Sequence, residues 1–111
     1  MKSEFLIVKY LKLYILSLNK YVENFPRKER ELKYRIINSS YEILELVYYC
    51  NLLEERTSLQ KSIIAKLSVL DFCFEYSFKN KYLSEKQFNK VSNDLTKIVK
   101  MIFGWIKSEK C

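Results

Sequence analysis

The chain has 111 residues, 49% of them hydrophobic and 30% charged, and this length fills one domain. It contains one glycine, one proline and no histidine, which excludes glycine-rich phosphate loops, Ser-His or Cys-His pairs and histidine-containing di-iron sites. The net charge of +7 favours a polyanionic partner, although a basic protein from a lysine-rich proteome would have the same balance. We therefore expect one domain over residues 1–111 that is not an enzyme and holds neither a cofactor nor a metal.

The cysteines and the N-terminal segment bear on the location of the protein. Cys50, Cys73 and Cys111 are odd in number and lack metal-binding spacing, so they indicate neither a disulfide framework nor a thiolate site. No apolar run reaches the roughly 18 residues of a membrane span. Glu4 and Lys9 interrupt the first apolar segment, which therefore reads as a helix rather than a signal peptide. These features predict a cytoplasmic protein without membrane contact.

Apolar residues recur at helical spacing along almost the whole chain, and three breaks divide it into four helices of roughly 20–28 residues. The first break is at residues 24–26, where Pro26 ends one helix and suits the first turn of the next. The second is at residues 55–58, where Thr57 and Gln60 have the spacing of a capping box. The third is at residues 80–84, where Ser84 and Gln87 repeat that spacing. Short links make neighbouring helices antiparallel, so we predict an all-α, up-down-up-down four-helix bundle.

The helix that follows Pro26 has two apolar stripes. The stripe expected to face the core consists of Leu32, Ile36, Ser39, Ile43, Leu46, Cys50 and Leu53. The stripe beside it consists of Ile37, Tyr41, Leu44 and Tyr48. Because one apolar stripe is enough for a helix in a monomeric bundle, the second stripe predicts a further packing partner.

The third helix is also apolar on two sides. Its core stripe consists of Ile63, Leu67, Leu70 and Phe74, and its second stripe of Ala65, Val69, Phe72 and Tyr76. Extra apolar stripes favour packing between copies of the same chain; the alternative is a wide core filled by bulky aromatic residues. The predicted oligomer interface consists of Ile37, Tyr41, Leu44, Tyr48, Val69, Phe72 and Tyr76.

The fourth helix has the clearest pattern, with alternating steps of three and four residues between its apolar positions. The predicted core seam is Phe88, Val91, Leu95, Ile98, Ile102 and Trp105. The opposite face carries Lys86, Lys90, Lys97, Lys100 and Lys107. A lysine stripe on a solvent face usually serves only solvation, so this stripe is a weaker indication of a binding surface.

Antiparallel packing would bring the basic ends of several helices together. The ends of the first and third helices and the starts of the second and fourth would share one pole, with Lys20, Arg27, Lys28, Arg30, Lys33, Arg35, Lys79, Lys81, Lys86 and Lys90 partly offset by Glu23, Glu29, Glu31 and Glu85. Bases at a helix start oppose the macrodipole, which is worth about 0.3–1 kcal/mol per charge, so helix stability does not explain them and a docking polyanion would. We predict that Arg27, Lys28, Arg30, Lys33, Arg35, Lys86, Lys90, Lys97 and Lys100 bind nucleic acid.

Three segments resemble the accessory variability determinant proteins of diversity-generating retroelements, within a wider group that includes the ribosomal-RNA intervening-sequence proteins. They are FPRKERELKYRI at 25–36, YLSEKQF at 82–88 and MIFGWIKS at 101–108, in the order and spacing of that family. The resemblance implies a barrel-like homopentamer that binds RNA or DNA without strong sequence preference. It also implies association with the retroelement reverse transcriptase in mutagenic retrohoming.

The third helix departs from the family pattern. Where the family places arginines in a Leu-Arg-x-x-x-Arg arrangement, this chain has Asp71 and Glu75. The alternative function is therefore a four-helix scaffold of the intervening-sequence type that binds only a protein partner.

Overall fold

Helices make up almost all of the computed structural model, which describes the backbone of residues 2–110 and the side chains of residues 6–109. They are α1 (Lys2–Val22), α2 (Arg30–Asn51), α3 (Thr57–Lys79) and α4 (Glu85–Lys110), with a single 3-10 turn, η1 (Arg27–Glu29), before α2. The three predicted breaks fall at the links between these helices. Among the residues described, none of the helices combines the length and the hydrophobicity of a membrane span.

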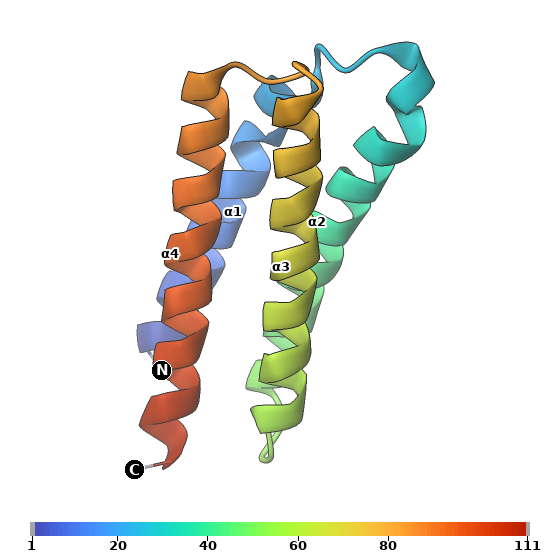
Figure 1. Cartoon of the computed structure of the whole chain (residues 1–111). Helices are drawn as coiled ribbons and strands as arrows, with labels where there is room; N and C mark the ends of the chain where they lie inside the picture. The colour runs from blue at the N-terminus through green and yellow to red at the C-terminus, as the bar shows by residue number, and fades with distance from the viewer. Residues whose placement is uncertain (1, 111) are drawn as a thin grey trace.

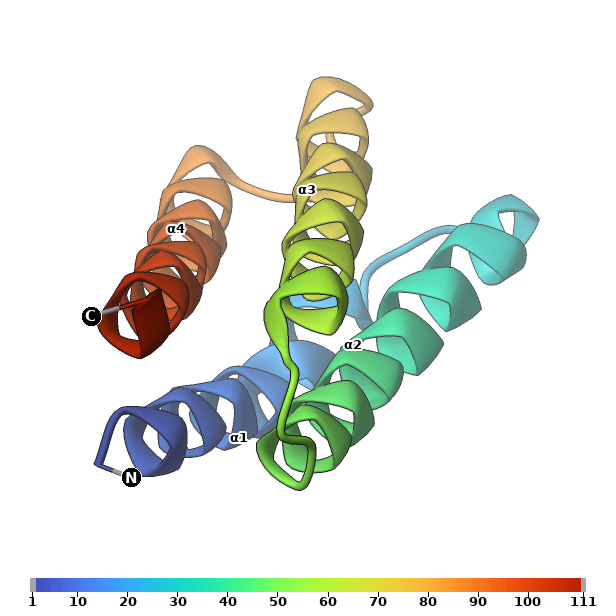
Figure 2. The ribbon, with the colours of Figure 1, turned by 90° about the horizontal axis from the view of Figure 1, so that it is seen from below.

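Each helix packs against the next along the chain, and α4 packs against α1. Figure 1 shows the antiparallel arrangement, with the α1–α2 and α3–α4 links at one end and both termini at the other. The end-on view in Figure 2 shows α1 opposite α3 and α2 opposite α4. The prediction of an all-α, up-down-up-down four-helix bundle is confirmed.

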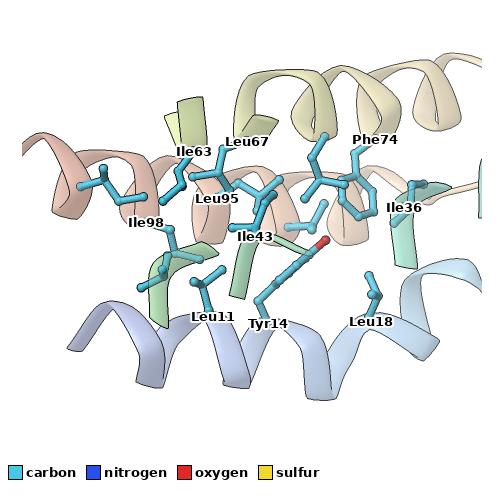
Figure 3. Packing of buried hydrophobic residues seen from close by; sticks show 14 of the residues in the cluster. Leu11, Tyr14, Leu18, Ile36, Ile43, Ile63, Leu67, Phe74, Leu95 and Ile98 are labelled. Atoms are coloured by element: carbon cyan, nitrogen blue, oxygen red, sulfur yellow. The ribbon is translucent and has the colours of Figure 1, made fainter. Parts of the chain in front are cut away.

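One face of every helix contributes to a single core. Figure 3 shows Leu11 and Tyr14 of α1 and Ile43 of α2 pointing toward Leu67 of α3 and Leu95 of α4, all almost completely buried. In the predicted seam of α4, Val91, Leu95, Ile98, Ile102 and Trp105 are buried, whereas Phe88 is half-buried and stacks on Phe78 with ring centroids 4.6 Å apart. The core stripe predicted for the third helix is likewise buried throughout.

The predicted core stripe of the second helix was partly wrong. Ser39 and Leu46 are only half-buried, and the neighbouring positions Ser40 and Val47 are fully buried in their place; the end members Leu32 and Leu53 are half-buried as well. A serine stands at both 39 and 40, so the pattern alone did not distinguish them. Tyr14 decides that Ser40 is the buried one, because the Tyr14 hydroxyl lies 2.7 Å from Ser40 Oγ. Ser40 Oγ also donates to the Ile36 carbonyl at 2.7 Å.

Of the two predicted capping boxes, the one before α4 is confirmed. The Ser84 N–H donates to Gln87 Oε1 at 3.0 Å, and the Gln87 N–H donates to Ser84 Oγ at 3.1 Å. The box at Thr57 and Gln60 was wrong, since α3 begins without a side-chain cap. The Gln60 side chain is instead fully buried and donates to Glu109 Oε1 at 3.1 Å.

Glu109 belongs to a polar network that closes the end of the bundle near the C-terminus. It forms an ion pair with Arg56 and accepts a hydrogen bond from Trp105 Nε1 at 3.1 Å. Arg56 also donates to the carbonyls of Leu53 at 2.7 Å and Asn51 at 3.0 Å. The network connects the α2–α3 link to α4. The charges of Arg56 and Glu109 at this end of the bundle are therefore paired with each other.

Candidate nucleic-acid interface

The opposite end of the bundle, which we call the basic pole, contains the α1–α2 and α3–α4 links (Figure 1). Side chains hold this end together: Gln87 Nε2 at the start of α4 donates to the Lys20 carbonyl at the end of α1 at 3.3 Å, and the Tyr82 hydroxyl donates to Glu29 Oε2 in η1 at 2.6 Å. The exposed cations of the pole are Lys20, Arg27, Lys28, Arg30, Lys79, Lys81 and Lys86. Helix packing therefore gathers positive charge from distant parts of the sequence at one end.

Glu29, an acid at the pole, interacts with tyrosines rather than with the neighbouring cations. It accepts the hydrogen bond from Tyr82, which raises the pKa of Tyr82 to about 12, and a longer one of 3.5 Å from Tyr76. Among the described residues, Arg27, Lys28 and Arg30 form no ion pair within 4.0 Å. Their positive charge is therefore available to a partner.

The turn that follows α3 presents one of the cations of the pole, Lys81. Lys81 has φ 66°, a left-handed conformation that glycine adopts at less cost. It follows the end of α3, where the Lys81 N–H donates to the Phe78 carbonyl and the Tyr82 N–H to the Ser77 carbonyl, both at 2.9 Å, the pattern of a Schellman motif. The turn thus carries a lysine where glycine is the common choice.

Of the four predicted binding lysines on the fourth helix, Lys86 belongs to the pole, and the other three are less available. Lys90 Nζ lies 3.0 Å from Asp94 Oδ2, which raises the pKa of Lys90, and Lys97 Nζ lies 3.9 Å from the ring centroid of Tyr10. Lys100 is exposed but lines a groove between α3 and α4 that also contains Asp71. These contacts place the three lysines along the flanks of α4, away from the free cations of the pole.

Arg35 also lies apart from the other predicted binding residues. It lines a groove between α2 and α3 with Glu42 and Lys66. It also lies beside the Cys73 thiol, where burial raises the pKa of that thiol and Arg35 partly offsets the rise. The structure therefore does not bring Arg35 together with Arg27 and Arg30.

A small hollow at the pole was missed by the sequence reasoning. It is lined by Phe25, Pro26, Arg27, Arg30, Lys33 and Tyr34 and has a volume of ≈ 350 Å³. Arg27 in η1 and Arg30 and Tyr34 in α2 follow steps of three and four residues, and this helical spacing was the signal in the sequence that could have placed them on one side. How the Phe25–Pro26 turn closes the hollow depends on the tertiary structure.

The residues of the predicted oligomer interface divide between two flanks. Tyr41, Tyr48, Val69, Phe72 and Tyr76 are exposed, and Ile37 and Leu44 are half-buried against the core. Tyr48 lies on the side of α1, with Lys12 Nζ 6.0 Å from its ring centroid, whereas Val69 lines the α2–α3 groove. Two different apolar flanks on one subunit suit head-to-tail contacts between copies, which join unlike patches.

Asp71 and Glu75, the two acids that depart from the family pattern, have different surroundings. Asp71 is half-buried, and burial together with Glu75 raises its pKa. Glu75 Oε2 lies 3.4 Å from Lys79 Nζ, one turn further along α3. Through this ion pair Glu75 offsets the charge of Lys79, a cation of the basic pole, whereas Asp71 lines the α3–α4 groove.

The described residues offer no group of three or more His, Cys, Asp or Glu side chains that could hold a metal ion. A scan against family models found no match, and searches of curated proteins and of solved structures found none either.

Proposed function

We propose that this protein is a non-enzymatic, oligomeric adaptor that binds nucleic acid through the basic pole. The observation that carries the proposal is the set of exposed cations at the pole, of which Arg27, Lys28 and Arg30 form no ion pair among the described residues. Contacts from such side chains to phosphate give affinity without reading the base sequence.

The oligomeric part of the proposal is supported by the two exposed apolar flanks. Phe72 is 60% exposed and Tyr41 is 57% exposed, and exposed apolar surface of this kind marks contact sites. The pentameric number and the reverse-transcriptase partner are proposed from the family resemblance alone. Association of the purified protein with a retroelement reverse transcriptase would test that partner.

A second candidate function is a scaffold that binds an acidic protein and no nucleic acid. Asp71 and Glu75 count against nucleic-acid binding and so favour this alternative, because they place negative charge on α3 where the resembling family carries arginines, and like charges repel. A complex with a protein partner that survives nuclease treatment, formed by a chain that does not bind RNA, would decide for this alternative.

The proposed binding is expected to weaken steeply as salt rises. Six phosphate contacts to a single strand would lower the affinity by about 10²–10³-fold between roughly 50 and 200 mM salt, because binding releases counterions from the nucleic acid. The measurement is a titration of fluorescently labelled single-stranded RNA with the full chain at both salt concentrations. No binding, or binding with no dependence on salt, would contradict the proposed function.

A further inference from the structure

The hollow at the basic pole has the chemistry of a specific subsite. We infer that it binds one unpaired nucleotide of a nucleic-acid strand, with the base stacked on Tyr34 and the flanking phosphates on Arg27, Arg30 and Lys33. This inference rests on the proposed function and goes further, because it predicts a preference for single strands over duplexes.

The wall of the hollow is held in place by contacts on its other side. The Phe25 ring packs against the Tyr82 ring with centroids 5.5 Å apart, and the Tyr82 hydroxyl is fixed by its hydrogen bond to Glu29. The backbone of the turn is also bonded, with the Phe25 N–H donating to the Val22 carbonyl at 3.1 Å. A site held in shape before binding loses less conformational entropy when its ligand arrives.

The positive charge around the hollow favours the binding of an anion. Arg27, Arg30 and Lys33 line it together, and within residues 6–109 none of the three has an ion-pair partner. Like charges held close together repel one another. A phosphate between them would relieve that repulsion and accept hydrogen bonds from the guanidinium groups.

The Tyr34 ring in the hollow indicates that a base binds beside the phosphate. Tyr34 is 54% exposed and lines the hollow beside the cations. Stacking of a base on such a ring strengthens single-strand binding by about 5–150-fold per base. In a duplex the faces of the bases are covered by their neighbours, so only an unpaired base can reach the ring.

The size of the hollow limits how much of the strand it accepts. Its volume of ≈ 350 Å³ is near the lower end of the roughly 300–1,000 Å³ found for small-ligand pockets. One nucleotide fits this range, and the rest of the strand would follow the cations outside the hollow.

The test compares two tyrosines of α2 that have equal exposure. Tyr34 and Tyr49 are both 54% exposed, but only Tyr34 lines the hollow. The variants Tyr34→Leu, Tyr34→Phe and Tyr49→Leu of the full chain are titrated with a labelled single-stranded oligonucleotide and with a duplex of the same length. We expect Tyr34→Leu to weaken single-strand binding about tenfold and to leave duplex binding unchanged, while Tyr34→Phe and Tyr49→Leu bind as the unchanged protein does.

Single-stranded RNA and DNA of the same sequence are both used, because the inferred contacts involve base and phosphate and omit the sugar hydroxyl. We expect them to bind alike, and a strict requirement for RNA would overturn the subsite. Equal losses on single strand and duplex for Tyr34→Leu, no loss at all, or equally strong binding of an acidic peptide would also overturn it. If the unchanged protein binds nucleic acid but the Tyr34 variants do not behave as expected, the subsite is wrong and the proposed function stands. If the unchanged protein binds no nucleic acid, the subsite and the proposed function are both wrong.

Discussion

The substitution Phe74→Ala is expected to lower the free energy of unfolding by about 3–5 kcal/mol. The Phe74 side chain is fully buried in α3, and its ring meets those of Tyr14 and Tyr21 edge-on, with both centroid distances at 6.3 Å. Alanine would leave a cavity and remove both ring contacts. Since domains of this size are stable by about 5–15 kcal/mol, the loss is a large part of the total, and urea unfolding followed by circular dichroism measures it.

The matched control for this prediction is Phe103→Ala. Phe103 is 55% exposed, and substitutions at exposed positions usually change stability by about 0.5 kcal/mol or less. Equal losses for the two alanine variants would show that the arrangement of the core is not the one described.

The substitution Phe72→Glu is expected to separate the proposed oligomer into single chains of 13.5 kDa. Phe72 is the most exposed of the residues assigned to the interface, and a carboxylate buried between subunits without a partner would cost several kcal/mol. Light scattering coupled to size-exclusion chromatography measures the mass of the particle before and after the substitution.

Tyr49→Glu is the control for assembly. Tyr49 is exposed on α2 but lies outside the predicted interface, so this variant is expected to keep the mass of the unchanged protein. A single-chain mass for the unchanged protein, or an unchanged mass for Phe72→Glu, would contradict the assembly proposed through α3.

The fold was predictable because helical periodicity and link chemistry agree along the chain. In α4 the steps of three and four residues located Val91, Leu95 and Ile98 correctly on the core face. Ser84 and Gln87 marked the start of that helix with a capping box that the structure contains. Both signals are local, so they can be read from a short stretch of sequence.

What the sequence did not predict depends on contacts between distant residues. The core position of Ser40 is decided by Tyr14 on another helix. The role of Gln60 is decided by Glu109, near the other end of the sequence. The local patterns at these positions also fitted the wrong predictions, because Ser39 stands next to Ser40 and Thr57 has the spacing of a capping box with Gln60.

The candidate site was predictable in part for the same reason. Antiparallel topology was enough to bring Arg27 and Lys86 to one pole, since it depends only on the order of helices and the length of links. The hollow beside Phe25 was not predictable, because the position of the Phe25 ring depends on its contact with Tyr82 in the other link. The position of Arg35 in the α2–α3 groove also depends on helix rotation, which a charge pattern does not fix.

The claim that binding belongs to the basic pole, and not to net charge, is tested most directly by two double variants with equal charge. Arg27→Glu with Arg30→Glu changes the pole, and Lys9→Glu with Lys61→Glu changes exposed lysines in the other half of the bundle. Each pair changes the formal net charge by −4, from +7 to +3.

The measurement is the dissociation constant of each double variant for the same single-stranded RNA at one salt concentration. We expect the pole variant to bind at least about 100-fold more weakly than the unchanged protein, because two charge-assisted contacts are lost, and the other variant to bind within several-fold of it. Equal weakening of the two variants would contradict binding at the basic pole.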